Sequence, residues 1–346
     1  MKISICVVQY NRIELLLKSL SIIERQTYPD IEICISDDCS TDNTVDEILK
    51  LQQTYKYPIV FHRNEVNKGF DFNYRKSIEI ASGDYAFVIG NDDSINGENS
   101  IADLVKFLEE NKYPDLGFCN MLEERTGNTV IKRAMKTTVL GSGADVAIKY
   151  YSCFVFVGGL IYKRSTFLKY NTDQYDGSIF TQMYLSVFMI CKGERAFSIK
   201  EPMVLKDILL DGKFRHSYRD RIAKTWDKYF ETNAGLFGLM HVVISGLKNA
   251  GLLQQKHIYK IFKRVYLVTY PHWIIDYKEN NAFPSAVGLF VGINPFKTDD
   301  FKLLNFFNKI RIFCLYIFTT VVAFLTPVFS FKKFKQKLYE YFKNYV

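Results

Sequence analysis

The 346-residue sequence lacks the motifs of several common protein classes. Its seven cysteines are an odd number without a Cys-x-x-Cys pair, which favours reduced core residues over a disulfide framework or a zinc ribbon. No Gly-x-Gly-x-x-Gly follows the first predicted strand, so a nicotinamide-dependent oxidoreductase is not favoured. Residues 1–4 enter a strand directly and leave no room for an export signal, so we expect a protein that is not secreted.

The sequence also lacks a nucleic-acid-binding motif, although its formal net charge is +8. Basic residues are spread along the chain except near its end, where lysines gather at positions 332, 333, 335, 337 and 343. Anionic lipid headgroups attract such a segment by roughly 1 kcal/mol for each nearby Lys or Arg. We therefore expect a membrane surface, and no nucleic acid, as a partner.

Strands and helices are predicted to alternate over the first 210 residues. Continuously apolar runs such as residues 3–8 are typical of strands that are buried on both faces of a parallel sheet. Further strands are predicted at 31–36, 58–61, 85–89, 116–120 and 154–162, with helices between most of them. Residues 123–142 are polar and irregular and predict a mobile loop or hairpin. The pattern predicts an α/β fold with a doubly wound, mixed sheet.

After about residue 210 the alternation stops, and helices are predicted at 219–230, 235–249 and 254–268. We expect two domains, 1–210 and a helical C-terminal region 211–346. Within the second, residues 312–331 carry no charge, are interrupted by Pro327 and follow Lys309 and Arg311. This length could span a bilayer. Because basic residues lie on both sides, an interfacial helix or a re-entrant hairpin at the cytoplasmic face fits the charge better, and a soluble core helix remains an alternative.

Two predicted strands end in paired acids. Asn91, Asp92 and Asp93 follow the apolar run 85–89, and Asp37 and Asp38 follow the run 31–36. In an open α/β sheet, ligands bind beyond the carboxyl ends of the strands. Carboxylates at that edge are suited to holding a divalent cation against a diphosphate. The sequence therefore predicts a site there.

Residues 8–12, 37–42 and 91–93, together with 67–69 and 81–85, resemble the family 2 glycosyltransferases with the GT-A fold. The resemblance covers roughly residues 1–200. It implies that the loop after strand one and the second acid after strand two hold the nucleotide, which gives the set Gln9, Tyr10, Asn11, Arg12 and Asp38. A carboxylate can accept a hydrogen bond from the imide group of a nucleotide base, and a tyrosine ring can stack on the plane of the base. Helix capping is the structural alternative for Asp38, although Ser40 or Asp42 could supply it.

The resemblance also implies a metal site. The last acid, Asp93, would bind Mg²⁺ or Mn²⁺, which bridges to the diphosphate of a nucleotide sugar, and Asp92 would lie beside it. Asn91 stands where the family usually has an acid, and its amide oxygen could contact ribose or a coordinated water. Arg75 would approach the diphosphate, and His216 would complete the metal shell or, with Arg215, contact phosphate. A solvated surface position is the alternative for Arg75 and His216.

Inverting sugar transfer needs a carboxylate to deprotonate the acceptor hydroxyl. The acidic pair that many family members carry before a helix is absent, and the equivalent stretch 173–182 offers Asp176 first and Asp173 second. Gln182 is the expected acceptor contact. The pair Gly158-Gly159 either lets the backbone approach an acceptor sugar or marks a bulge in a strand.

The expected function is an inverting, metal-dependent glycosyltransferase that transfers a hexosyl or deoxyhexosyl group. The donor would be a nucleoside-diphosphate sugar, and the acceptor a lipid-linked oligosaccharide at the cytoplasmic face of the inner or plasma membrane. Residues 158–162 and 176–182 resemble the members that build O-antigen and capsule polysaccharides. A non-catalytic, membrane-associated protein that binds sugar nucleotides is the alternative, because the acidic pair is missing.

Overall fold

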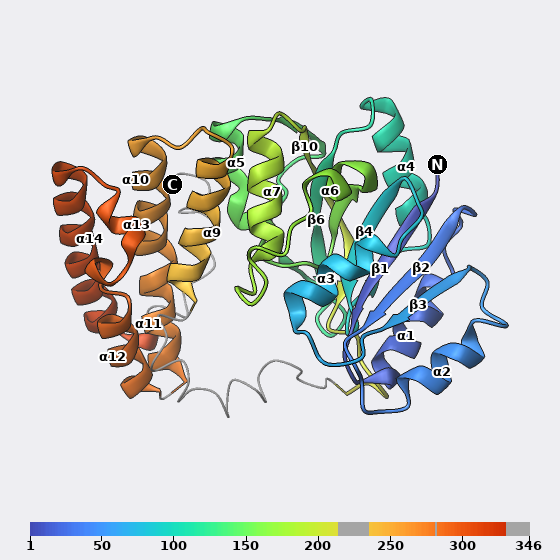
Figure 1. Cartoon of the computed structure of the whole chain (residues 1–346). Helices are drawn as coiled ribbons and strands as arrows, with labels where there is room; N and C mark the ends of the chain where they lie inside the picture. Colours follow the sequence, from blue (N-terminus) through green and yellow to red (C-terminus); the bar gives the residue numbers. More distant parts are fainter. Residues whose placement is uncertain (214–234, 281, 330–346) are drawn as a thin grey trace. The chain divides into compact units, whose positions relative to one another are not determined.

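The computed structural model describes residues 1–213, 235–280 and 282–329 of the chain (Figure 1). It divides into two compact units, Met1–Arg215 and His216–Val346. The predicted helix at 219–230, His216 and the lysines beyond residue 331 lie outside the described residues. Each unit is described by itself.

Unit 1 contains a ten-stranded mixed sheet. Eight strands follow the order β3-β2-β1-β4-β9-β6-β10-β5, and the other two, β7 and β8, pair with β6 and β10. The strands are β1 Ile3–Gln9, β2 Ile31–Asp37, β3 Ile59–Arg63, β4 Tyr85–Gly90, β5 Ser94–Ile95, β6 Leu116–Glu123, β7 Thr129–Ile131, β8 Thr138–Gly141, β9 Leu160–Lys163 and β10 Ala196–Lys206. Strands β1 to β4 are parallel, whereas β9 runs antiparallel to both of its neighbours.

Helices cover both faces of this sheet (Figure 1). The helices of unit 1 are α1 Ile13–Ile23, α2 Thr44–Leu51, α3 Phe70–Glu79, α4 Ser100–Glu110, α5 Ala144–Tyr150, the 3-10 turn η1 Tyr151–Phe154, α6 Arg164–Tyr170 and α7 Thr181–Cys191. One apolar core joins α1, α2 and α4 to alternate residues of β1 and β2, such as Ile5 and Ile33. On the other face, the ring of Phe167 contacts Tyr74 of α3 and Tyr162 of β9. The predicted doubly wound α/β class is confirmed.

Unit 2 is helical in its described part. Its elements are α9 Leu236–Asn249, α10 Gln255–Arg264, the π-helical turn η2 Val265–Thr269, α11 Tyr270–Glu279, α12 Phe283–Gly292, the 3-10 turn η3 Pro295–Lys297, α13 Asp299–Lys302 and α14 Phe306–Leu325. Helix α14 packs against α10, η2, α11 and η3. By length and composition it is the one helix among the described residues that could cross a membrane.

Three predicted segments can be compared with the structure. Residues 123–142, predicted as a loop or hairpin, include β7, which forms a hairpin with β6, and β8, which pairs with β10; the hairpin is thus confirmed. The strand predicted at 154–162 begins only at Leu160; the segment before it ends the 3-10 turn η1 at Phe154 and continues as a loop whose carbonyl groups at 156 and 158 accept hydrogen bonds from Arg133. Helix α14 begins at Phe306, before the predicted apolar segment 312–331, and ends at Leu325, shortly before Pro327, where the sequence predicted an interruption.

Candidate functional site

The loops that follow β1, β2 and β4 meet at one edge of the sheet. Parallel register pairs Gln9 with Asp37, and Val8 with Gly90, so the three strands end at the same level. The Asn91 amide donates to the carbonyl oxygens of Tyr10 (3.3 Å) and Asn11 (3.1 Å). The three loops therefore form one connected structure, as the sequence predicted from its acids alone.

Three non-glycine residues adopt left-handed backbone conformations in these loops. They are Asn11 (φ 54°), Arg12 (φ 59°) and Cys39 (φ 62°). Such conformations are unfavourable and persist when the surroundings over-determine them, often at functional sites. Here the Asn11 backbone amide donates to Ser40 Oγ (2.7 Å), and Asn11 Oδ1 accepts from the Thr41 backbone amide (2.8 Å). The loops after β1 and β2 hold each other in place.

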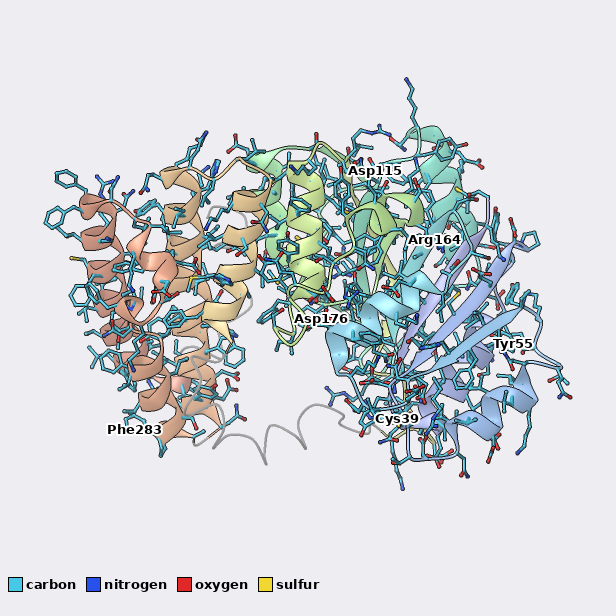
Figure 2. The ribbon with its side chains drawn as sticks, viewed as in Figure 1. Cys39, Tyr55, Asp115, Arg164, Asp176 and Phe283 are labelled. Atoms are coloured by element: carbon cyan, nitrogen blue, oxygen red, sulfur yellow. The ribbon has the colours of Figure 1, made fainter. Side chains whose placement is uncertain are left out.

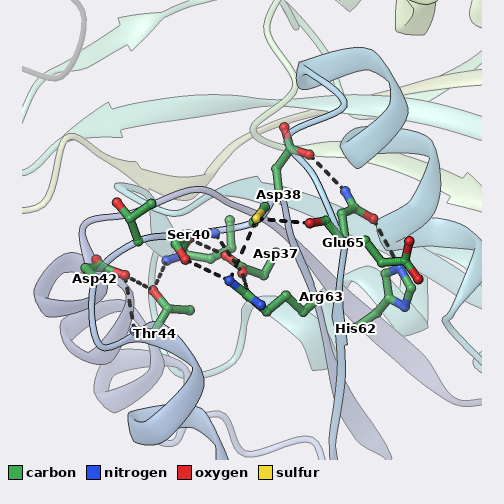
Figure 3. A network of polar contacts seen from close by, with 12 residues as sticks. Asp37, Asp38, Ser40, Asp42, Thr44, His62, Arg63 and Glu65 are labelled. Carbon is green, nitrogen blue, oxygen red and sulfur yellow. Dashed lines mark hydrogen bonds and ion pairs between the residues drawn. The ribbon is translucent and has the colours of Figure 1, made fainter.

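Asp38 is 4% exposed and is held by the loop between β3 and α3. Its Oδ1 accepts from the Asn64 side chain (2.9 Å) and the Lys68 backbone amide (2.7 Å), and its Oδ2 accepts from the Gly69 amide (2.9 Å). Gly69 has φ +87° at the start of α3, a conformation that favours glycine. Asp38 does not cap α2: the Thr44 amide at the start of that helix donates to Asp42 instead (Figure 3).

Asp37, the first acid of this pair, is fully buried and serves the loop itself. It accepts from the Ser40 backbone amide (3.0 Å) and hydroxyl, and Arg63 Nε lies 3.6 Å from its Oδ2 (Figure 3). Burial raises the pKa of Asp37, and the bonds from Ser40 partly oppose this. Sequence reasoning gave Asp37 no separate role, although Asp side chains often accept hydrogen bonds from the backbone of a turn that follows them.

Asp92 and Asp93 converge above Gly90. A methyl group added to Gly90 would lie 3.0 Å from Asp92 Oδ1 and 3.5 Å from Asp93 Oδ2. Asp92 is partly exposed and pairs with Arg12 across 3.2 Å. Asp93 is 7% exposed, and its Oδ1 accepts from the Asp207 backbone amide (3.2 Å). Burial first, and the charge of Asp92 second, raise the pKa of Asp93 to about 8.

These two carboxylates fit a divalent cation. The described residues contain no group of three or more His, Cys, Asp or Glu side chains that could enclose a metal ion by themselves. Mg²⁺ commonly binds through one or two carboxylates and completes its shell with water and substrate phosphate. The charge of Lys206 opposes the rise in the pKa of buried Asp93 only in part, and a bound cation would stabilise the ionised carboxylate further.

The loop of residues 155–159 packs against Asp93. A methyl group on Gly158 would lie 2.7 Å from both Asp93 Oδ2 and Met121 Cε, and one on Gly159 would lie 2.5 Å from Cys119 Sγ. The two glycines therefore allow close approach to the protein's own side chains. The predicted strand bulge is wrong at this position, because the residues precede β9.

A buried arginine holds the 155–159 loop in place. Arg133 is 6% exposed and donates to the carbonyl oxygens of Cys119 (2.6 Å), Cys153 (3.0 Å), Phe156 (2.7 Å) and Gly158. Burial lowers its pKa. Sequence reasoning missed this residue, since a single arginine in a polar segment gives no signal that it turns inward.

Arg75 and Asp176 form an ion pair between α3 and the loop before α7. Arg75 is 7% exposed, and its Nε and Nη2 donate to the two carboxylate oxygens of Asp176 at 2.9 and 2.5 Å. Arg75 Nη1 lies near Glu79 (3.4 Å) and Asn171 (3.5 Å). The side chain is thus not a solvated helix face. Figure 2 labels Asp176 in this loop.

Helix α3 holds the same loop a second time. Asp71 is 2% exposed and accepts from the backbone amides of Ile179 (2.7 Å) and Thr181 (3.3 Å). Gln182, at the start of α7, is 1% exposed and donates to the Val155 carbonyl (2.9 Å). Gln182 therefore links this loop to the 155–159 loop that packs on Asp93. Asp173, in the same loop as Asp176, is exposed.

The predicted residues thus fall into two groups. Residues 9–12, Asp38 and residues 91–93 lie together at the sheet edge. Arg75 and Asp176 form the second group, which is connected to the first through α3, where the Asn73 amide donates to the Gln9 carbonyl (2.9 Å). His216 lies outside the described residues, and its predicted role stays a prediction.

Comparison with known proteins gives a consistent result. The family model described as glycosyl transferase family 2 matches residues 4–170. The abequosyltransferase RfbV of Salmonella typhimurium is 32% identical over 203 residues, which are 55% of this chain and 60% of the relative. A Campylobacter jejuni enzyme named GalNAc(5)-diNAcBac-PP-undecaprenol beta-1,3-glucosyltransferase is 24% identical over 63% of this chain and 70% of its own length.

A solved structure shows the same fold. Residues 1-349 of S. aureus TarS, crystallised in complex with UDP, superpose with a TM-score of 0.60 at 15% identity, covering 96% of this chain and 92% of that one. At this identity the likeness concerns the fold alone. The chain spans about 60% of the length of RfbV, so the activity of the whole relative does not transfer with the match.

Proposed function

We propose, from the premise that residues 4–170 form a family 2 glycosyltransferase domain of the GT-A type, that this chain transfers a hexosyl or deoxyhexosyl group from a nucleoside-diphosphate sugar. The proposed acceptor is a lipid-linked oligosaccharide in surface polysaccharide biosynthesis, and the proposed stereochemistry is inversion. Similarity to an abequosyltransferase and to an enzyme named for an undecaprenol-linked acceptor supports this choice. The observation that carries it is the convergence of Asp92 and Asp93 beside the loops around Gln9 and Asp38.

The loops after β1 and β2 would hold the nucleotide. Gln9 is fully buried, its amide nitrogen donates to Asn11 and Thr44, and its Oε1 has no hydrogen-bond partner among the described residues. Buried polar atoms are nearly always paired, so a free acceptor at this edge supports a ligand that donates to it. We propose that Gln9, Tyr10, Asn11 and Asp38 contact the base and ribose.

The edge above Gly90 would hold the diphosphate. We propose that Asp93 binds Mg²⁺ or Mn²⁺, and that Asp92, Asn91 and Arg12 lie beside the diphosphate. A bound divalent cation would neutralise the negative charge that develops on the departing nucleoside diphosphate. Until it binds, the buried Asp93 carboxyl is held near Asp207 and Gly158 in a fixed position, which limits the reorganisation that binding requires.

Two acids are candidates for the base that deprotonates the acceptor. Both oxygens of Asp176 accept from Arg75, so proton uptake by Asp176 would weaken an ion pair that is largely buried. Asp173 lies three residues earlier in the same loop and is exposed. This contact favours Asp173 as the base, and Asp176 and Arg75 as the pair that positions the loop. We propose Gln182, at the start of α7, as the acceptor contact.

A non-catalytic protein that binds sugar nucleotides is the second candidate. It is favoured by the same observation, because Asp176, the first candidate for the base in the sequence, is already paired with Arg75. The two functions differ in turnover, because only an enzyme consumes the donor.

A thermal-shift screen tests donor binding. UDP-, GDP-, CDP- and dTDP-sugars are added with and without Mn²⁺ to the wild-type chain, to Asp93→Asn and to the exposed control Asp46→Asn. A ligand at 100 times its Kd stabilises the folded state by about 2.7 kcal/mol, which corresponds to a rise of roughly 5–10 °C for a unit of this size. We expect one donor to give such a rise in the wild type and the control.

Asp93→Asn should lose the part of the rise that depends on Mn²⁺. Release of the labelled nucleoside diphosphate then separates an enzyme from a binding protein. If no donor raises the melting temperature, or if Asp93→Asn responds to Mn²⁺ as the wild type does, the proposal is wrong.

A further inference from the structure

Helix α14 has one face packed into unit 2. The buried residues are spaced by four, three, one and three positions, as one face of a helix requires: Ile312, Tyr316, Thr319, Thr320 and Ala323. Thr320 shares a hydrogen bond with the Tyr270 hydroxyl (2.7 Å), and the Tyr316 hydroxyl donates to the Phe290 carbonyl (2.7 Å). This face belongs to the core of the helical unit.

The opposite side of α14 joins α12 and η3 in what we call the outer apolar face. Its largest members are 52–75% exposed: Phe283, Val291, Phe296, Phe307, Phe318 and Leu325. Two ring contacts link α14 to these neighbouring elements, since Phe283 meets Phe324 (5.7 Å between centroids) and Phe296 meets Phe313 (5.4 Å). Figure 2 labels Phe283, at the start of α12. Exposed apolar residues that gather on one surface often mark a site of contact with a protein or a membrane, whereas single exposed apolar residues need no such explanation.

The structure argues against a membrane span by α14. Arg311 lies inside the helix, so its uncharged part runs only from Ile312 to Leu325. About 14 residues give roughly 21 Å at 1.5 Å per residue, whereas the hydrocarbon core of a bilayer is about 30 Å thick. Lys278 of α11 also donates to the carbonyl oxygens of residues 323, 324 and 326, which ties the end of α14 to its own unit.

Positive charge borders the outer apolar face. Residues 293–329 contain two acids, and both are paired: Asp299 with Lys302 (2.6 Å) and Asp300 with His241 (3.0 Å). Lys297 and Arg311 are exposed beside the apolar residues of η3 and α14. A helix with apolar residues on one side and nearby basic residues is attracted to anionic lipid and lies in the plane of the interface.

We propose that the outer apolar face docks flat on an anionic lipid bilayer, so that unit 2 binds one leaflet without crossing it. The proposed function enters this inference only as the reason for docking, which would bring the enzyme to a lipid-linked acceptor. The docking itself follows from the contacts, exposure and charge of unit 2.

Vesicle sedimentation of the full chain tests the proposal. We expect binding to vesicles of phosphatidylcholine with phosphatidylglycerol, weaker binding to phosphatidylcholine alone, and weakening by salt because screening reduces surface attraction. The variant Phe307→Ser/Phe318→Ser/Leu325→Ser should lower the partition coefficient about tenfold or more, since it removes three side chains that would enter the interface. The matched control Leu49→Ser/Val66→Ser/Met135→Ser changes three exposed apolar residues of unit 1 and should bind as the wild type does.

Three results would overturn the proposal. One is unchanged vesicle binding by the α14 variant. A second is wild-type protein that stays in the pellet after an alkaline carbonate wash, as a spanning protein does. The third is a wild type that does not bind vesicles but forms a dimer in light scattering, together with an α14 variant that is monomeric. The donor-dependent thermal shift is measured on the same samples, so that a failure of the proposed function is seen separately from a failure of docking.

Discussion

The ion pair between Arg75 and Asp176 allows a quantitative test of how the loop before α7 is held. Breaking a buried pair by removing one partner typically costs about 3–5 kcal/mol, because a charge is left buried alone. Arg75 is 7% exposed but Asp176 is 23% exposed, so water would partly compensate. We therefore expect Asp176→Asn to lower the free energy of unfolding by about 2 kcal/mol, which is less than that range.

A double-mutant cycle isolates the pair. Urea unfolding is measured for Arg75→Met, for Asp176→Asn and for the double variant. The removed charges compensate each other in the double variant, so we expect a coupling energy of about 1–2 kcal/mol. The exposed pair between Lys50 and Glu47 is the control, and its cycle should give under about 0.5 kcal/mol.

Sugar transfer by the same variants decides the role of Asp176. If Asp176 positions the loop, the double variant should recover part of the activity that Asp176→Asn loses, and Asp173→Asn should be the more damaging change. A general base contributes typically 10²–10⁴-fold to rate. A loss of that size in Asp176→Asn that persists in the double variant, together with a coupling energy near zero, would refute the reasoning.

Three further predictions concern single residues. Burial alone would raise the pKa of Glu32, but hydrogen bonds from Lys2 and two serines lower it from 4.5 to about 2. The ionised Glu32 therefore stabilises the fold fully above pH 4.5, and this contribution is lost as the pH falls through about 2. The free energies of urea unfolding of Glu32→Gln and the wild type should differ by about 3 kcal/mol at pH 7 and by much less at pH 2. Gly158→Ala should lower the free energy of unfolding by about 1–3 kcal/mol, because the new methyl group overlaps Asp93 and Met121; a melting temperature equal to the wild type's would contradict this. Chelation of divalent cations should abolish donor turnover, and Mn²⁺ should restore it in the wild type but not in Asp93→Asn; turnover that survives chelation would exclude a metal at this position.

Much of the fold and of the sheet-edge site could be predicted from local sequence. A continuously apolar run such as residues 3–8 suits a strand between two others, and β1 does lie between β2 and β4. Acids that directly follow such runs must emerge at the carboxyl edge of the sheet. That is why Asp38, Asp92 and Asp93 could be placed near one another before any contact was known.

What the sequence alone determined is therefore which segments are buried, which are helical and which polar residues lie at strand ends, because these follow from residue patterns over a few neighbouring positions. Only the tertiary structure decided that Arg75 faces Asp176, 101 residues away, and that Arg133 turns inward to hold the loop that packs on Asp93. The same holds for α14, whose inner face packs on unit 2 and whose end accepts hydrogen bonds from Lys278. The physical reason is that a contact between distant loops depends on how the elements pack in three dimensions. The local periodicity of a segment does not indicate which distant residue it will contact.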